Sequence, residues 1–333
     1  MAQTRQLSGN ALLRSVRENL AMYRDAIEPS GKGIAVVRFT PTDSDSPEWV
    51  RRMEASRVSA NQKVKAFSYL GFTVDHLVLP GTVSAAEFAD RIDAFNADDH
   101  IRAIIVQFPP PARLTPLVQR LEQIKDIDGL LEDRSPHRAC ATADGISRVV
   151  IPVAEEASIA VVGARGFVGR GVVRLLKDHG LDVIPLDIGD DLRRAAHADI
   201  VVSTAGKPHI LTPDHIKPHH RLVVDSGFTP LPDGTVAGDI HPAATYIPQN
   251  ITPVPGGVGP IEMAVLMDRI IRQEADPELT PWTCPQAMFL PRTHFVETAS
   301  HPGPTGRARQ PLAQPKPPPQ RGHDHGRDDG RTR

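Results

Sequence analysis

The stretch IAVVGARGFVG at residues 159–169 decides the fold of this chain. Four apolar residues typical of a buried strand lead into a turn with glycines at 163, 166 and 169, and a helical pattern then runs to residue 178. Dinucleotide sites use this order. One glycine makes the turn, one lets the backbone approach the pyrophosphate, and one allows close packing of the helix on the strand. The stretch therefore predicts a Rossmann-like nucleotide turn made by Gly163, Ala164, Arg165, Gly166 and Gly169.

Asp187 bears on the choice between the two nicotinamide cofactors. It ends the next predicted strand, about 20 residues beyond the turn, where an acidic residue typically accepts hydrogen bonds from the adenosine ribose and repels a 2′-phosphate. Arg165 favours NADP instead, because a guanidinium near the ribose can hold a 2′-phosphate. A plain polar loop or helix cap is the competing interpretation of Asp187. The sequence predicts NAD or NADP as cofactor and favours NAD.

Strands and helices alternate on both sides of this stretch. Before it, we expect strands at residues 34–39, 73–79 and 103–108 and helices at 10–27, 48–70 and 84–96. From residue 158 the pattern restarts, with strands at 158–162, 182–186, 200–203 and 222–225. Such alternation predicts an α/β fold of two domains with parallel sheets. We place the domains at residues 1–145 and 146–260, joined near 145–156, and expect a helix at 261–275 to pack back onto the first.

Composition excludes several classes of protein. The 333 residues are 40% hydrophobic and 23% charged with a net charge of −2, which describes an ordinary globular protein with no nucleic-acid partner. The apolar runs are too short to cross a membrane. Two cysteines form neither a disulfide framework nor a metal-binding spacing, so we expect a cytoplasmic protein without a metal. Residues 276–333 are rich in proline and arginine and are predicted to be a disordered tail.

A second glycine-rich stretch, TPVPGGVGP at residues 252–260, precedes the helix predicted at 261–275. Proline fixes φ and lacks an amide donor, while glycine opens conformations that other residues avoid, so neither helix nor sheet suits this stretch. A stiff loop with few side chains that opens a helix brings backbone amides close to a ligand. We interpret it as the wall of a binding site; a tight structural turn is the alternative.

Three polar residues of the first domain are candidates for chemistry. Lys63 lies in a predicted helix, Gln107 ends an apolar strand, and Asp128 sits in a probable turn. A lysine acts as a base only if its pKa is lowered, which burial does and a nearby carboxylate opposes. Taken singly, each residue is more typical of a solvated surface or a cap, and no spacing argument joins the three.

Several short motifs in order make the chain resemble the bifunctional methylenetetrahydrofolate dehydrogenase/methenyltetrahydrofolate cyclohydrolase family. The most specific is ITPVPGGVGP at 251–260. IVQFP at 105–109, KDIDG at 125–129, AGKP at 205–208, VDSG at 224–227 and GDI at 238–240 support it. The resemblance covers residues 10–272.

The resemblance implies an N-terminal folate-binding catalytic domain, an NAD(P) domain and a homodimer. It implies oxidation of 5,10-methylenetetrahydrofolate by hydride transfer to NAD(P), and hydrolysis of the methenyl product to 10-formyltetrahydrofolate. It carries three catalytic roles over to Lys63, Gln107 and Asp128, with Lys63 expected to face a cleft. The substrate-binding and remaining cofactor-binding positions that it implies are Ser59, Pro255, Gly256, Gly259, Glu262, Ala205 and Gly206.

Two departures from the family pattern fall beside the lysine. Ser59 replaces a tyrosine one helical turn before Lys63, and Glu262 replaces a threonine. A serine hydroxyl cannot stack on a substrate ring as a tyrosine does. Two alternatives therefore stay open beside the bifunctional enzyme: a dehydrogenase that has lost the hydrolysis, and a non-catalytic protein that binds nucleotide or folate.

Overall fold

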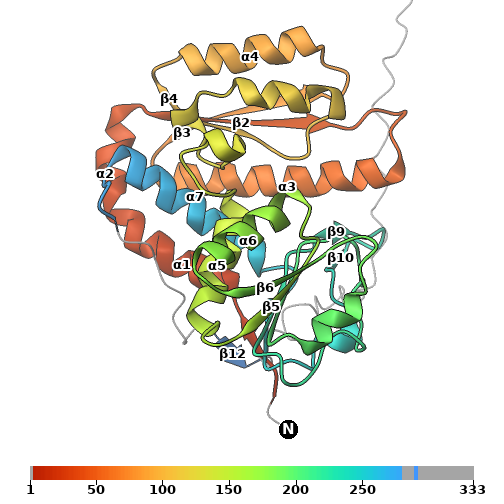
Figure 1. The fold of residues 1–333 in the computed structure, drawn as a ribbon. Coiled ribbons are helices and arrows are strands. Elements are labelled where there is room, and N and C mark those ends of the chain that lie inside the picture. The colour runs from red at the N-terminus through yellow and green to blue at the C-terminus, as the bar shows by residue number, and fades with distance from the viewer. Residues whose placement is uncertain (1–2, 280–288, 292–333) are drawn as a thin grey trace, which may run out of the picture. The chain divides into compact units, whose positions relative to one another are not determined.

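The computed structural model describes residues 3–279 and the backbone of residues 289–291. A three-stranded parallel sheet has the order β3-β2-β4, formed by β2 (Gly33–Thr40), β3 (Thr73–Pro80) and β4 (Ile101–Val106). Helix α3 (Pro47–Tyr69) and helix α4 (Ala85–Ala97) lie on opposite sides of it (Figure 1). Successive side chains of a strand point to opposite faces. Val36 accordingly packs in the cluster that holds Phe67 of α3, and Val37 in the cluster that holds Phe88 of α4.

A second sheet has seven strands in the order β12-β1-β11-β8-β7-β5-β6. Its strands are β1 (Arg5–Leu7), β5 (Ser158–Val162), β6 (Asp182–Leu186), β7 (Ile200–Ser203), β8 (Leu222–Asp225), β11 (Asn250–Ile251) and β12 (Phe289–Pro291). All neighbours are parallel except β1 and β12. Helix α6 (Phe167–Asp178) connects β5 to β6, as in the predicted nucleotide-binding unit. Strands β9 (Thr229–Pro230) and β10 (Val236–Ala237) form a separate antiparallel pair.

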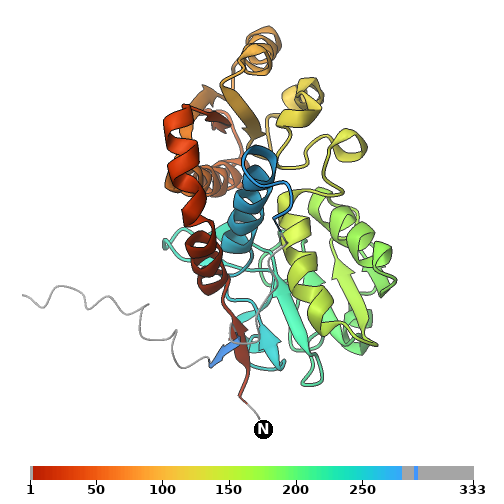
Figure 2. The ribbon, with the colours of Figure 1, turned by 90° about the vertical axis from the view of Figure 1, so that its left-hand side faces the viewer.

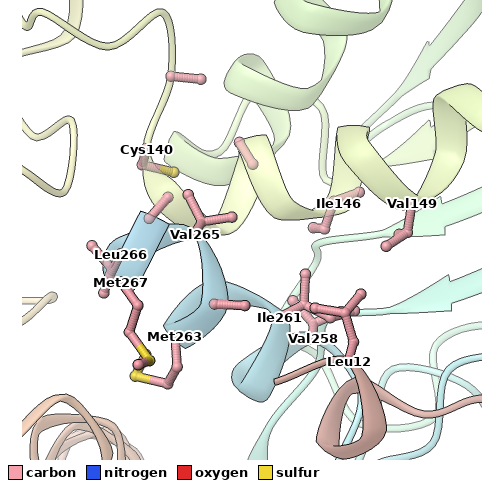
Figure 3. Close-up of a cluster of buried hydrophobic side chains, with 14 of the residues drawn as sticks. Leu12, Cys140, Ile146, Val149, Val258, Ile261, Met263, Val265, Leu266 and Met267 are labelled. Atoms are coloured by element: carbon pink, nitrogen blue, oxygen red, sulfur yellow. The ribbon is translucent and has the colours of Figure 1, made fainter. Parts of the chain in front are cut away.

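Helix α7 (Val258–Glu274) packs against α1 (Gly9–Leu20), α3 and α5 (Ala141–Val150). Figure 2 shows it, in blue, between α1 and α5. Apolar side chains of α7, among them Ile261 and Val265, meet Ile146 of α5 and Leu12 of α1 in one buried cluster (Figure 3). The helix begins three residues before the predicted position 261, because a proline such as Pro260 is tolerated in the first turn, where its missing amide has no acceptor in the helix.

Helix α5 was not predicted from the sequence, which suggested a join between domains near residues 145–156. Gly145 favoured that interpretation, yet it lies inside the helix. A Cβ at Gly145 would come within 2.7 Å of Cγ2 of Ile261, so the glycine allows α5 and α7 to approach closely rather than breaking the helix.

The two ends of the chain also differ from what the sequence predicted. Residues 5–7, placed in the first domain from the sequence, form β1 of the seven-stranded sheet, and the helix expected at 10–27 is divided into α1 and α2 (Arg24–Ile27) by a 3₁₀ turn. Within the predicted disordered tail, Phe289–Pro291 pair with β1 as β12, and residues 276–279 continue from α7. The rest of the tail lies outside the described residues.

Candidate active site

Lys63 is the buried centre of a group of polar side chains. It lies in the middle of α3, and only 1% of its side chain is exposed. Its ammonium donates to Oγ of Ser59 at 3.1 Å, one helical turn earlier, and to Oε1 of Gln107 at 3.0 Å, just beyond β4. It also donates to Oε1 of Glu262 on α7 at 2.5 Å. The structure thus brings together four residues predicted from sequence, but the lysine is enclosed rather than exposed to a cleft.

Burial and charge act in opposite directions on Lys63. Burial by itself lowers the pKa of its ammonium, but the carboxylates of Glu262 and Asp128 outweigh burial, so that the pKa lies above its usual value. The Cys140 thiol, also nearby, has its pKa raised to about 12 by burial and stays neutral. The group is therefore an ammonium with two carboxylates around it rather than a neutral amine.

Asp128 lies near Lys63 but acts on it through charge, since the two share no direct hydrogen bond. The backbone carbonyl of Asp128 accepts from the Ala141 amide at 2.9 Å, at the start of α5. The preceding Asp126 is fully buried, and its carboxylate accepts the backbone amides of Gly129, Leu130 and Leu131. Asp126 therefore shapes the turn, which leaves Asp128 as the carboxylate near the lysine.

Two further residues fix this turn, and the sequence analysis assigned a role to neither. The Lys125 ammonium donates to backbone carbonyls at residues 95, 96 and 98, at the end of α4. The buried Arg269 guanidinium, on α7, donates to the carbonyls of Ile127 and Ala139 and to the Asp144 carboxylate. Lys125 was visible in the KDIDG motif, whereas Arg269 sits in an amphipathic pattern that gives no signal of this contact.

The loop at 252–260 lies beside these residues. Gly256 has φ +100°, a conformation that favours glycine, and its carbonyl accepts the Asn10 amide at 3.2 Å. Pro255 precedes it after a cis peptide bond. Gly259 faces α3, with Oε1 of Gln62 3.7 Å from where its Cβ would be. The loop is thus packed between the beginning of α1 and α3, a structural role in addition to the predicted wall of a binding site.

The predicted nucleotide turn has the expected tight geometry. Gly163, with φ +82°, and Ala164 both donate their amides to the Leu186 carbonyl, at 2.9 and 3.1 Å. A Cβ at Gly169 would lie 2.1 Å from the Gly163 carbonyl oxygen. Helix α6 begins after Gly166, which has no side chain to cap it. The first amides of the helix therefore remain free of side-chain partners and suit an anionic phosphate group.

Asp187 lies at the end of β6 against this turn. Its carboxylate accepts the amides of Arg165 at 2.6 Å and Ile188 at 2.7 Å, and these bonds, that of Arg165 foremost, lower its pKa. The Arg165 guanidinium lies 3.7 Å from the carboxylate of Asp190. The turn therefore presents a charged Asp187, with the neighbouring arginine directed to another acid.

The predicted cofactor residues Ala205 and Gly206 are close to the turn. The site of a Cβ on Gly163 lies 2.8 Å from the Ala205 amide nitrogen. The buried Asp239 carboxylate accepts the amides of residues 205, 206 and 207. Asp225 in turn accepts the amide of Asp239 and those of two further residues, and burial raises its pKa to about 6. The VDSG and GDI motifs thus hold the 205–207 loop in place.

A pair of aromatic rings connects Lys63 and its partners Ser59, Gln107 and Glu262, here called the lysine group, to the nucleotide turn. Phe108, next to Gln107, stacks on Phe167, next to Gly166, with ring centroids 5.4 Å apart and planes 12° from parallel. Phe108, which follows the Lys63 partner Gln107, thus contacts Phe167, the first residue of α6. The lysine group and the nucleotide turn are therefore placed relative to each other by direct packing.

The described residues contain other features that bear on function. A pocket of about 600 Å³ lies elsewhere, lined by Thr42, Asp45, Trp49, Gly81, Thr82, Ser84, Pro111, Ala112 and Arg113, and none of the predicted site residues lines it. In the same part of the chain, no helix is long and apolar enough to cross a membrane. No group of three or more His, Cys, Asp and Glu residues there could hold a metal ion.

Two family models match consecutive parts of the chain. Residues 7–128 match the tetrahydrofolate dehydrogenase/cyclohydrolase catalytic domain, and residues 140–276 match the NAD(P)-binding domain of the same family. The first match contains Lys63 and Gln107 and ends at Asp128. The second contains the nucleotide turn and Glu262. Both expected domains are therefore present, in the order that the sequence analysis proposed.

Individual proteins agree with the family models. "Bifunctional protein FolD" of Bordetella avium is 33% identical over 298 residues, which are 83% of this chain and 99% of the relative. "Bifunctional protein FolD 1" of Hydrogenovibrio crunogenus is 31% identical, over 80% and 96%. The crystal structure of the FolD dehydrogenase/cyclohydrolase of Campylobacter jejuni is similar with TM-score 0.69 and 25% identity, over 80% and 97%. The two family models and these relatives agree, and the chain belongs to the tetrahydrofolate dehydrogenase/cyclohydrolase family.

Proposed function

We propose that this protein oxidises 5,10-methylenetetrahydrofolate to the 5,10-methenyl form, with NAD(P) as hydride acceptor, and hydrates the product to 10-formyltetrahydrofolate. The observation that carries the proposal is the contact of buried Lys63 with Gln107, close to the Asp128 charge, in a chain that matches both domains of the family. A protein that only bound nucleotide or folate would have no physical need for a buried ammonium held at this place. Lys63, Gln107 and Asp128 are the proposed catalytic residues.

The residues around the turn suit a nicotinamide dinucleotide. Gly163, Gly166 and Gly169 leave room for the backbone to approach a pyrophosphate, and the first amides of α6 favour its negative charge. The 205–207 loop, held by Asp239, forms the adjacent edge of the site. When bound there, the cofactor supplies hydride-accepting chemistry, while the protein supplies position and electrostatics.

We propose NAD as the preferred cofactor. The Asp187 carboxylate accepts two backbone amides, which leaves lone pairs for the ribose hydroxyls. A 2′-phosphate at the same place would meet a negative charge. Arg165, the residue that could offset this charge, lies near Asp190 instead.

The charges around Lys63 suit the oxidation step. Loss of hydride makes the one-carbon unit between the two folate nitrogens a cation. Two carboxylates, Glu262 and Asp128, surround one ammonium while the Cys140 thiol stays neutral, so the group as a whole is negative. A preorganised negative field stabilises developing positive charge. We propose that Ser59, Pro255, Gly256 and Gly259 position the folate beside this group.

Purified protein tests the function through two chromophores. Incubation with methylenetetrahydrofolate and either NAD or NADP should produce the absorbance of the reduced nicotinamide, faster with NAD. Methenyltetrahydrofolate supplied alone should lose its own absorbance faster than in buffer. Oxidation without hydration would indicate a dehydrogenase only, and nucleotide binding with neither reaction would indicate a binding protein. The comparisons favour neither of these two alternatives.

We also propose that the protein is a homodimer and acts in a reducing cytoplasm. The dimer is what the family resemblance implies, and two cysteines without a disulfide framework support a reducing compartment. Light scattering after size-exclusion chromatography should give twice the mass of the chain. A monomeric mass at micromolar concentration would reject the dimer.

A further inference from the structure

We propose that Glu262, and not Lys63, accepts the proton of the attacking water in the hydration step, while Lys63 remains a cation that anchors the Glu262 carboxylate. This inference rests on the proposed hydration of methenyltetrahydrofolate. It assigns a chemical role to the position where the chain departs from the family pattern, an acid at the entry of α7.

The hydrogen bonds of Lys63 leave it no free donor. An ammonium has three N–H bonds and no lone pair, and Lys63 has three acceptors: Ser59, Gln107 and Glu262. To act as a base, the lysine would first have to lose a proton. That loss would break a hydrogen bond and leave the Glu262 carboxylate beside a neutral amine. The geometry therefore holds the lysine in its charged form.

Glu262 is better placed than Lys63 to meet a water molecule. Its side chain is 14% exposed, against 1% for Lys63. Among the described residues only Lys63 hydrogen-bonds to its carboxylate, through Oε1, so Oε2 is open to another donor. The remaining neighbours do not compete for the role: the Gln107 amide does not titrate, and burial keeps the Cys140 thiol protonated. Asp128, the other carboxylate, is buried in its turn, and its Oδ1 accepts the Ala141 amide at 3.4 Å.

The proposed step balances in protons and electrons. The water oxygen forms a bond to the methenyl carbon while the Glu262 carboxylate takes one proton from the water. The resulting carbinol then collapses: the bond from carbon to N5 breaks, its electron pair goes to N5, and N5 takes the proton from Glu262. The hydroxyl proton leaves through the same carboxylate to solvent as the formyl C=O forms. The sum is methenyl cation plus water giving 10-formyltetrahydrofolate plus one proton, without any redox change.

Glu262→Gln tests the assignment because the two candidate bases predict opposite changes. If Glu262 is the base, the rate of hydration should fall by about 10²-fold or more, the usual contribution of a general base. Oxidation, for which Asp128 keeps part of the negative field, should fall less, so the ratio of hydration to dehydrogenation should fall. If Lys63 is the base, removal of the carboxylate makes the buried amine easier to deprotonate, so hydration should be kept or rise at neutral pH. The second result would overturn the proposal.

A matched control lies on the same helix. The Glu274 side chain is 1% exposed and pairs with Lys32 and Arg102, so Glu274→Gln removes a buried acid of the same kind away from the site. It should leave the hydration ratio unchanged. If Glu262→Gln fails to fold by circular dichroism, Glu262→Asp replaces it. The aspartate keeps a carboxylate one methylene further back, so hydration should fall because the carboxylate no longer reaches the same place. An unchanged ratio in the aspartate variant would reject the proposal.

The assays separate this inference from the function on which it rests. A wild-type protein that oxidises methylenetetrahydrofolate but never hydrates the product would overturn the role of Glu262 and leave the dehydrogenase intact. A protein that does neither would overturn the proposed function itself. Hydration and oxidation in the wild type, with the ratio lowered in the Glu262 variants and unchanged in Glu274→Gln, would support both.

Discussion

The nucleotide turn and the lysine group are built from different parts of the chain. At the turn, backbone amides and carbonyls between residues 163 and 186 hydrogen-bond to one another, and glycines keep the space clear. Around Lys63, side chains do so: Gln107 is 44 positions away in sequence and Glu262 is 199 away. A site made of backbone tolerates new side chains as long as they add no bulk. A site made of side chains can change its chemistry with one substitution, as we propose for position 262.

The first prediction tests the turn by adding a single methyl group. Gly169→Ala would place Cβ 2.1 Å from the Gly163 carbonyl oxygen, so strand and helix must separate. We expect a loss of about 1–3 kcal/mol in the free energy of unfolding, together with loss of detectable dinucleotide binding. Urea unfolding and calorimetric titration with NAD measure the two effects.

Gly166→Ala is the graded control for that prediction. Its Cβ would lie 3.2 Å from the same oxygen, and its φ of −66° suits any residue. The loss in stability and in affinity should therefore be smaller than at position 169. Equal losses at the two positions would show that close packing at Gly169 does not set the geometry of the turn.

The second prediction tests the site built from side chains. Lys63→Met should lower hydration by about 10²-fold or more, because the Glu262 carboxylate loses the cation that positions it. It should also lower the free energy of unfolding by about 3 kcal/mol, since a mostly buried carboxylate is left without its partner. Lys32→Met is the control: Lys32 also pairs with a buried glutamate, but Glu274 keeps its ion pair with Arg102, so the loss of Lys32 should cost less than about 1 kcal/mol. Equal costs would show that leaving a buried carboxylate without a cation is not what destabilises Lys63→Met.

The same contrast explains what the sequence could predict. The turn, the strands at 158–162, 182–186, 200–203 and 222–225, and the place of Asp187 follow from local patterns, and the structure has them at those positions. Lys63, Gln107 and Asp128 could be singled out from the sequence, but only the family motifs joined them into one site, because their contacts join distant segments. The burial of Lys63 and the contact with Glu262 depend on the docking of α7 against α3, which no local pattern encodes. Helix α5 was missed because Gly145 looks like a break until its neighbour Ile261 is known.

The third prediction concerns Asp187, the side chain at the turn that we propose favours NAD over NADP. Asp187→Ser removes a negatively charged carboxylate. The backbone amides of Arg165 and Ile188 hold the pKa of this carboxylate below its usual value. Near a protein surface, repulsion between such a charge and a nearby phosphate is about 1–4 kcal/mol. Without it, the ratio of NADP affinity to NAD affinity should rise about tenfold or more. Asp182→Ser, at the opposite end of the same strand, should leave the ratio unchanged. A constant ratio in the Asp187 variant would remove this residue from the ribose site.

The smallest effect comes from His220, a buried group at which burial outweighs the charge of the nearby Asp199 carboxylate. His220 is fully buried, its Nδ1 accepts the Lys217 amide, and burial lowers its pKa to about 4. The pKa of His220 is lower in the folded protein than in the unfolded chain. Its contribution to the free energy of unfolding is therefore complete above about pH 6.5 and is lost as the pH falls toward the folded pKa. His220→Asn keeps an acceptor for the amide and removes the titration. Between about pH 7.5 and about pH 5.5, the wild type should therefore lose about 1 kcal/mol more stability than the variant in urea unfolding. Other titrating groups, among them His137 and Asp225, are common to both proteins and cancel in this difference. Parallel curves would mean that burial does not keep His220 neutral, and that the contrast with Lys63, where neighbouring charge outweighs burial, does not hold.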